Sequence, residues 1–372
     1  MNGFKKSPLY LTVGRFFGRI VKKMIKRKKT KVIKIGSLKV GGNFPILVQS
    51  MTNTPTWDIK KTVHQIKELE KAGCEIIRVG VPDLKSAKAL GKIKKKINIP
   101  LVADIHFSAR LALEAINQGV DKIRINPGNF PESDLKQVVE LAKKKKIPIR
   151  IGINSGSLEK GILKENKRVT AEMMVKSALK NIKLIENLNF HDLIISLKSP
   201  DILRTIRAYE ILSKKTKYPL HLGITEAGTE FPGTIKSAIA IGFLLLKGIG
   251  DTIRISLSAD PIKEVKVAWE ILKSLDLRKR GIKIISCPTC ARSQINVIKI
   301  ATELEKKIKQ IEKPFTIAIM GCVVNGLGEG REANLGIVGV VNNMALIMKE
   351  GKIIKRVKEK NILPEIKKLL LT

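Results

Sequence analysis

The 372-residue sequence predicts a (β/α)₈ barrel of the TIM type followed by a small α+β domain. Eight short runs rich in β-branched residues each precede a segment whose apolar residues have helical spacing. Each run is continuously apolar, which is typical of parallel strands buried on both faces. Parallel strands also need connections long enough to form a helix. The alternation stops near residue 281, where a different architecture begins.

The barrel elements are expected to follow in order from residue 31. A hairpin around Gly36 comes first, over residues 31–40, and we expect it to close the barrel floor. The eight strands are predicted at Ile46–Met51, Glu75–Val81, Leu101–Ile105, Lys122–Asn126, Pro148–Asn154, Leu193–Lys198, Leu220–Thr225 and Thr252–Leu257. A doubly wound open sheet is the alternative fold. It normally has fewer units and a Gly-rich first turn, and no such turn follows Met51.

The C-terminal region predicts a mixture of strands and helices. Two strands are expected at Ile282–Ser286 and Phe315–Met320, with a helix at Val297–Ile311 between them. A Gly-rich loop then leads to apolar runs at Leu335–Val341 and Met344–Met348, and a last helix is expected near residue 358. We therefore divide the chain into a basic extension (1–30), a barrel (31–280) and a cysteine-bearing domain (281–372).

The composition sets limits on the class of protein. The net charge of +38 suggests a nucleic-acid binder, but the lysines are spread along the chain and only 4% of residues are aromatic. We therefore expect solvated lysine faces and no nucleic-acid partner, with a metal-stabilised nucleic-acid-binding module as the alternative. No run of about eighteen apolar residues predicts a membrane span. Four cysteines with one close pair favour a reducing compartment over a secreted framework.

The first 57 residues contain thirteen lysines or arginines and no acid. The segment from Leu11 to Lys29 has the pattern of a basic amphipathic helix, which is typical of an organelle-targeting peptide or of a helix bound to a membrane surface. Serine is sparse there, so a simple extension is favoured. We expect a bacterial cytoplasmic protein, with the plastid stroma as the alternative.

Cationic side chains recur toward the ends of the predicted barrel strands, where barrel enzymes place their active residues. These cations are Arg78, Arg124, Arg150, Lys198 and Arg254. Buried unpaired guanidinium groups are costly, so a ring of them predicts a pocket for a polyanion with at least two phosphates. Neutral hydrogen bonds are expected from Asn154, Thr225 and Ser256.

Two acids, Asp104 and Glu226, belong to the same ring of strand ends. Either is a candidate proton donor if its pKa is raised. The alternative is that each pairs with a neighbouring arginine, which would lower its pKa.

Three cysteines in the C-terminal domain describe an incomplete cage for a soft metal. Cys287 and Cys290 form a Cys-x-x-Cys pair, and Cys322 stands alone in a Gly-rich loop. A zinc ribbon needs two such pairs. An iron–sulfur cube has four corners, so three thiolates leave one iron without a protein sulfur. Glu329 is a candidate fourth ligand, and Asn325 is a candidate for orienting ligand or substrate.

Seven motifs in order along the chain closely resemble those of 4-hydroxy-3-methylbut-2-enyl diphosphate synthases, the iron–sulfur enzymes of the non-mevalonate isoprenoid pathway. The motifs are Val48–Thr54, Leu101–Phe107, Ile123–Asn129, Pro148–Asn154, Pro219–Gly228, Cys287–Cys290 and Gly321–Gly326. One departure is Leu327, which stands where the family usually has proline.

The resemblance implies a [4Fe–4S] cluster held by Cys287, Cys290, Cys322 and Glu329, with Asn325 beside its open iron. The substrate would be 2-C-methyl-D-erythritol 2,4-cyclodiphosphate, and Glu226 would serve acid chemistry. The diphosphate would be gripped by Arg78, Arg124, Arg150, Asn154, Lys198, Thr225, Arg254 and Ser256. The resemblance further implies a homodimer, in which the cluster domain of one chain caps the barrel of the other, and electron supply by flavodoxin or ferredoxin.

Overall fold

The computed structural model describes residues 25–158, 168–308 and 311–371. These residues form two compact units that meet in the sequence between Arg278 and Lys279. Each unit has its own hydrophobic core, and we describe each one by itself. None of the described helices is long and apolar enough to cross a membrane.

The first unit contains a ring of eight parallel strands. The strands are β3 (Leu47–Met51), β4 (Ile76–Gly80), β5 (Leu101–Asp104), β6 (Lys122–Ile125), β7 (Ile149–Asn154), β8 (Leu193–Lys198), β9 (His221–Leu222) and β10 (Thr252–Ile253). The strands β3 to β8 pair in sequence order, β9 pairs with β10, and β10 pairs with β3. A parallel bridge between Ile195 and Leu220 joins β8 to the start of β9 and closes the ring. The predicted (β/α)₈ barrel is confirmed, although its last two strands are shorter than expected.

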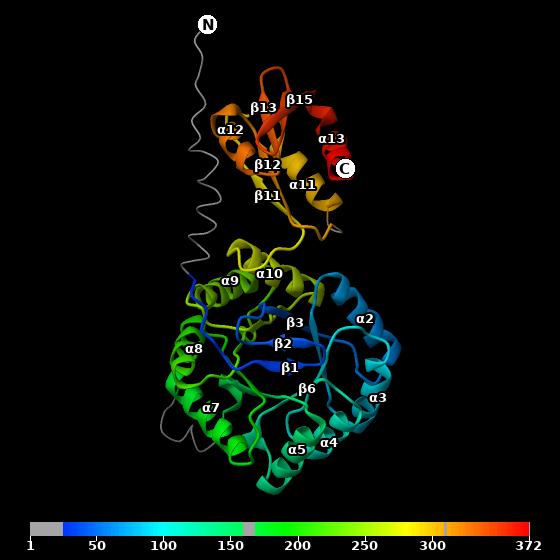
Figure 1. Cartoon of the computed structure of the whole chain (residues 1–372), viewed down its shortest axis with the longest axis vertical. Coiled ribbons are helices and arrows are strands. Elements are labelled where there is room, and N and C mark those ends of the chain that lie inside the picture. The colour runs from blue at the N-terminus through cyan, green and yellow to red at the C-terminus, as the bar shows by residue number, and fades with distance from the viewer. Residues whose placement is uncertain (1–24, 159–167, 309–310, 372) are drawn as a thin grey trace. The chain divides into compact units, whose positions relative to one another are not determined.

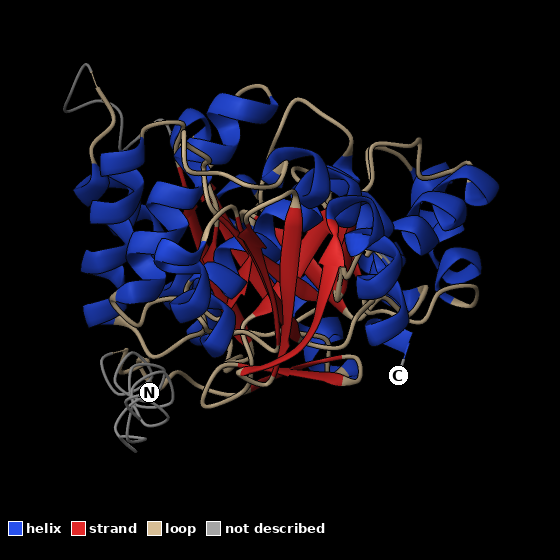
Figure 2. Cartoon of the chain, turned by 90° about the horizontal axis from the view of Figure 1, so that it is seen from above, coloured by secondary structure: helices blue, strands red, loops and turns tan. Residues whose placement is uncertain are grey.

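Helices surround the strands on the outside, as Figures 1 and 2 show. They are α2 (Ile59–Lys71), α3 (Leu84–Lys94), α4 (Ala109–Asn117), α5 (Glu132–Lys145), α7 (Ala171–Glu186), α8 (Ile202–Lys215), α9 (Glu230–Leu246) and α10 (Pro261–Ser274). Several begin at a residue whose side-chain oxygen accepts from a backbone N–H in the first turn, as Asp83 does for Ser86. Short 3₁₀ turns, η1 (Pro127–Asn129) and η2 (Ser155–Ser157), follow β6 and β7.

A hairpin lies across the barrel opening that faces the viewer in Figure 1. Its strands are β1 (Ile33–Ile35) and β2 (Leu38–Val40), and Gly36 takes a φ of +56° in the turn between them. One side of the hairpin packs on residues near the amino-terminal ends of the barrel strands, among them Ile76 and Ile194. This end of the barrel interior is therefore an apolar plug, and the polar interior residues lie beyond it.

The second unit is a five-stranded sheet with helices. Its strands lie in the order β11 (Ile282–Ser286), β12 (Phe315–Met320), β13 (Leu335–Val340), β14 (Met344–Lys349) and β15 (Lys352–Lys358). The first three strands are parallel and the last two pair antiparallel. The helical elements are α11 (Val297–Lys307), α12 (Val323–Glu332), η3 (Glu359–Asn361) and α13 (Ile362–Leu371).

One expectation for this unit was wrong, and one strand was not predicted. Residues 352–358 form that edge strand, and the expected last helix follows it as η3 and then α13 from Ile362. The Gly-rich segment after Cys322 is the helix α12 rather than a loop. Glycines serve close packing here: a Cβ on Gly330 of α12 would lie 2.9 Å from the sulfur of Met348, and one on Gly336 of β13 would lie 2.6 Å from the Gly330 Cα. Glycine at these positions lets the helix approach the sheet closely.

Candidate active site

A small polar pocket of about 100 Å³ lies where the carboxyl ends of the barrel strands converge. All eight residues predicted to bind a diphosphate line it, together with Asp104, His106 and Ser196. The eight are Arg78, Arg124, Arg150, Asn154, Lys198, Thr225, Arg254 and Ser256. Because the strand ends meet in a closed barrel, residues from the five strands β4 to β8 and from the connections after β5, β9 and β10 reach one cavity.

Asp104 is the acidic centre of this pocket. Its carboxylate lies 3.2 Å from Arg124 Nη1, 3.8 Å from Arg78 Nε and 3.5 Å from His106 Nε2. Burial opposes ionisation of Asp104, but Arg78, His106 and Arg124 outweigh it and hold its pKa well below the usual range. Asp104 is therefore a carboxylate that balances two guanidinium groups.

Other cations in the pocket keep donors without a partner among the described residues. Arg150 is 1% exposed, and its Nε and Nη1 make no hydrogen bond to any described residue. The same holds for Lys198 Nζ and for Arg254 Nε. A buried donor without an acceptor destabilises the protein by about 1–3 kcal/mol. Several such donors in one cavity indicate a site for an anion.

The electrostatics agree with this assignment. Burial and then the nearby Arg254 and Arg150 lower the pKa of Lys198 well below its ordinary value. Burial and the proximity of Arg78 lower the pKa of Arg254 to about 10, while Glu264, 3.9 Å away, opposes the shift. An anion bound among these cations would offset their mutual repulsion.

Glycines make room for two of the cations. A Cβ on Gly152 would lie 2.2 Å from Arg124 Nε, and one on Gly223 would lie 2.6 Å from Lys198 Nζ. Both glycines lie on or beside barrel strands, β7 and β9. The side chains of Arg124 and Lys198 therefore occupy space that the Cβ of any other residue at positions 152 and 223 would fill.

Glu226 lies at the edge of this arrangement. It is exposed and does not line the pocket, whereas its neighbour Thr225 does. Its φ of +52° is in the left-handed region, which costs a residue with a Cβ about 1–2 kcal/mol. Strained backbone of this kind clusters at functional sites, so the position of Glu226 remains consistent with a role in the reaction.

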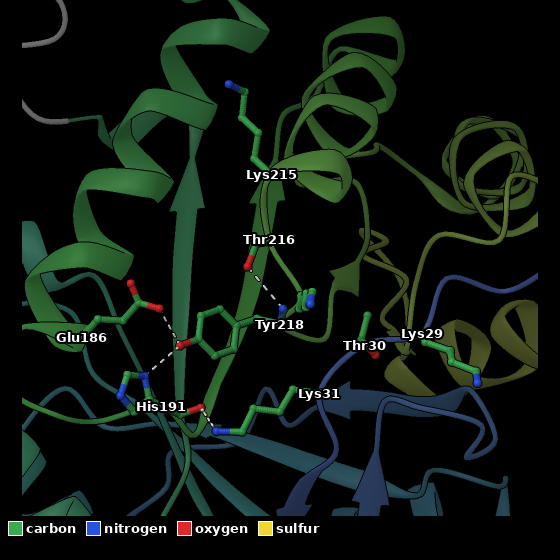
Figure 3. A pocket seen from close by; sticks show the side chains of 9 residues that line it. Lys29, Thr30, Lys31, Glu186, His191, Lys215, Thr216 and Tyr218 are labelled. Atoms are coloured by element: carbon green, nitrogen blue, oxygen red, sulfur yellow. Dashed lines mark hydrogen bonds between the residues drawn. The ribbon is translucent and has the colours of Figure 1, made fainter.

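A larger hollow of about 700 Å³ lies near the amino-terminal ends of β8 and β9 (Figure 3). Its buried Tyr218 donates to Glu186 Oε1 at 2.7 Å and lies 3.3 Å from His191 Nδ1. Figure 3 shows the side chains of Lys29 and Lys215 directed away from this group. Its cations do not converge as those of the smaller pocket do, so size alone does not make this hollow the active site.

In the second unit, two of the three predicted cysteine ligands follow adjacent strands of the sheet. Cys287 follows β11 and Cys322 follows the adjacent parallel strand β12. The Gly321 N–H donates to Cys287 Sγ at 3.2 Å, which brings the first thiol beside the residue that precedes Cys322. Cys290 is exposed, and all three are free thiols. The donor set therefore suits a soft metal centre.

The predicted fourth ligand lies on the helix that Cys322 begins. Cys322 is the N-cap of α12, and Asn325 and Glu329 are exposed on it, Glu329 two turns from the cap. Among the described residues, no three His, Cys, Asp or Glu side chains lie close enough to hold a single metal ion. The four predicted ligands therefore do not form a compact coordination shell in this structure.

The sequence matches two known domains in order. It matches the GcpE TIM-barrel domain over residues 30–269 and the GcpE protein C-terminal domain over residues 283–372. The chain belongs to the GcpE family. This confirms the family predicted from the motifs. The family consists of iron–sulfur oxidoreductases of isoprenoid precursor biosynthesis.

Curated relatives cover nearly the whole chain. A 4-hydroxy-3-methylbut-2-en-1-yl diphosphate synthase (flavodoxin) from Caldanaerobacter subterraneus subsp. tengcongensis is 59% identical over 347 residues, which is 93% of this chain and 98% of the relative. The enzyme of the same name from Caldicellulosiruptor saccharolyticus is 58% identical over 339 residues, 91% of this chain and 97% of the relative.

Solved structures show likeness of fold alone. An N-acetylneuraminic acid synthetase from Leptospira borgpetersenii serovar Hardjo-bovis aligns with a TM-score of 0.50 at 13% identity, over 76% of this chain and 98% of that one.

Sequence reasoning missed three buried polar residues that belong to the site or its support. Ser196 lines the pocket, two residues before Lys198 on β8. Glu264 reaches the barrel from α10, accepts from the Leu257 N–H at 2.9 Å and lies near Arg254. Lys122 is fully buried, two residues before Arg124 on β6. Ser196 and Lys122 could have been identified from the sequence, because each lies two residues before a predicted pocket residue and side chains alternate along a strand.

Proposed function

We propose that this chain converts 2-C-methyl-D-erythritol 2,4-cyclodiphosphate to 4-hydroxy-3-methylbut-2-enyl diphosphate. The observation that carries the proposal is the pocket of buried cations whose donors have no acceptor within the described protein. A diphosphate supplies the missing acceptors and charge. The names of relatives at 59% and 58% identity support the same substrate. A nucleic-acid-binding function is not favoured, because the decisive cations face the inside of a small cavity.

The residues of the pocket divide into two tasks. Arg150, Lys198 and Arg254 bind the diphosphate oxygens through donors that are free in the absence of substrate. Asn154 and Ser256 add neutral hydrogen bonds from the same rim. Asp104 holds Arg78 and Arg124 in place. Since its pKa is held low, Asp104 is a poor proton donor, and we assign it to positioning rather than to acid catalysis.

The reaction consumes two electrons and one proton. The bond between a ring carbon and a diphosphate oxygen breaks, an adjacent hydroxyl leaves as water, and a carbon–carbon double bond forms. Arginines stabilise the negative charge that develops on the released diphosphate oxygen. We assign the proton for the departing water to Glu226, which adjoins the pocket residue Thr225.

We propose that Cys287, Cys290, Cys322 and Glu329 hold a [4Fe–4S] cluster. Three free thiols, two of them just after adjacent strands, support this ligand set, and the family is one of iron–sulfur enzymes. When bound, such a cluster would supply electrons one at a time. Asn325, exposed on the first turn of α12, would orient substrate beside it.

The partners of the enzyme are also proposals. The printed names of the relatives favour flavodoxin over ferredoxin as the electron donor. An exposed apolar stripe on α9 supports a homodimer, because its members recur at helical spacing and a large exposed apolar face marks an interaction surface. The stripe comprises Phe231, Ile235, Ile239, Phe243 and Leu246.

We place the enzyme in the cytoplasm of a bacterium, since the relatives are bacterial. The N-terminal extension lies mostly outside the described residues, and so does most of the segment with the pattern of a targeting peptide.

The test is turnover by anaerobically reconstituted protein with the cyclodiphosphate and a strong reductant. Wild-type protein should form the allylic diphosphate with release of water. Lys198→Met should keep the cluster and lose substrate affinity, because Lys198 Nζ is a free donor in the pocket. Lys143→Met, at an exposed lysine of α5, is the matched control and should behave as wild type. No product from fully reconstituted wild-type protein would refute the proposed function.

A further inference from the structure

Lys122 is a buried lysine that the proposed reaction does not use directly. It lies at the start of β6, its side chain is fully buried, and it does not line the active-site pocket. Its Nζ has a long contact of 3.4 Å with Gln49 Oε1. Because side chains alternate along a strand, Lys122 faces the same side as Arg124, one layer deeper in the barrel.

The charged groups that act on Lys122 from other strands of the barrel are mostly cationic. Arg150 of β7 and Arg78 of β4 repel its charged form, and His221 of β9 interacts with it from across the interior. Burial first, and then these arginines, lower the pKa of Lys122 well below its ordinary value. His221 is also buried, with Nδ1 2.8 Å from Thr252 Oγ1 and with Nε2 unpartnered.

A charged lysine at this depth would face costs that no described contact offsets. Gln49 provides one distant acceptor, and the pocket carboxylate Asp104 is already engaged by Arg78 and Arg124. An uncharged amine, in contrast, has a lone pair. It still donates to Gln49 Oε1, and its lone pair is an acceptor that the charged form lacks.

We propose that Lys122 is uncharged in the free barrel and takes up a proton when a diphosphate binds in the pocket one layer away. This inference rests on the proposed function, because it requires a diphosphate among the pocket arginines. The bound anion offsets the cations Arg78 and Arg150, and the interior then tolerates one more positive charge. Lys122 is thus a positioning residue that adjusts the charge of the barrel interior to that of the ligand.

The consequence is an affinity that depends on pH. If binding takes up one proton, affinity falls tenfold for each pH unit between the pKa of the free protein and that of the complex. The direction follows from linkage: the ligand raises the pKa of Lys122, so binding is strongest below the window and weakens as pH rises through it. The diphosphate itself gains charge as pH rises, which works in the opposite direction.

The experiment measures proton uptake directly. Full-length protein is titrated with inorganic pyrophosphate by calorimetry, near neutral pH, in buffers of different ionisation enthalpy. Wild-type protein should take up protons on binding, and Lys122→Met should take up fewer by about half to one proton. Lys143→Met, at an exposed lysine, should match wild type.

An effect of the substitution on folding can be distinguished from an effect on proton uptake. Lys122→Met replaces a buried amine with an apolar side chain of similar length, so its melting temperature should be equal or higher. Lys122→Gln is a second variant with the same expected loss of uptake. Equal proton uptake by wild type and Lys122→Met would overturn the assignment to Lys122 while leaving the pocket intact. Absence of pyrophosphate binding by wild type would overturn the pocket and this inference together.

Discussion

Replacing Arg150 by methionine should move stability and substrate affinity in opposite directions. Arg150 is 1% exposed, and two of its guanidinium nitrogens have no acceptor in the described protein. Hydrogen bonds to charged groups contribute about 1.5–3 kcal/mol each, so losing two costs at least about 3 kcal/mol of binding. At 1.4 kcal/mol for each tenfold change, affinity for the cyclodiphosphate should fall about a hundredfold or more.

The same substitution should stabilise the protein without ligand. Removing a buried donor that lacks a partner recovers about 1–3 kcal/mol, less any cavity left by the shorter side chain. Chemical denaturation gives the free energy of unfolding, and calorimetry gives affinity. Lys143→Met controls for loss of one positive charge at an exposed site. Undiminished affinity in Arg150→Met, or a stability loss as large as that of a core truncation, would refute the reasoning.

Two other substitutions test the supports of the site. Asp104→Asn leaves Arg78 and Arg124 without their carboxylate and should lower the free energy of unfolding by about 3–5 kcal/mol at neutral pH. Since the pKa of Asp104 is depressed in the folded protein, its carboxylate stabilises the fold above about pH 4, and this stabilisation is lost as the pH falls through the folded pKa. The free energies of unfolding of variant and wild type, measured in urea, should therefore converge in acid. A difference that does not depend on pH would contradict the pairing. Gly336→Ala brings a Cβ to 2.6 Å from the Gly330 Cα and should destabilise the second unit by about 1–3 kcal/mol, which an unchanged melting temperature would contradict.

The barrel could be predicted because its signals are local and repeated. Continuous apolar runs followed by helical spacing marked every barrel strand, and β3 to β8 lie within a residue or two of the predicted bounds. The last two strands end earlier than predicted, and Thr225 and Ser256 line the pocket from the connections that follow them. Pocket membership was likewise predictable, because strand ends in a barrel converge whatever their order.

The rest depended on packing between distant residues. Glycines after Cys322 suggested a loop, since glycine disfavours helices, but Gly330 meets Gly336 of a strand and that contact holds α12 against the sheet. The role of Glu264 was hidden because a helix residue reveals its barrel partner only after the fold is known. The ionisation of Asp104 also required distances to two arginines from other strands.

The most direct test is to measure iron, acid-labile sulfide and turnover together in anaerobically reconstituted protein. We expect about four irons and four sulfides per chain, with activity, in wild type. Cys74→Ala is the matched control, because Cys74 is buried in the barrel core with its pKa raised to about 12, and it should retain both. Cys322→Ser should lose cluster and turnover together. Wild-type protein that binds neither iron nor sulfide yet still converts the cyclodiphosphate would contradict the account.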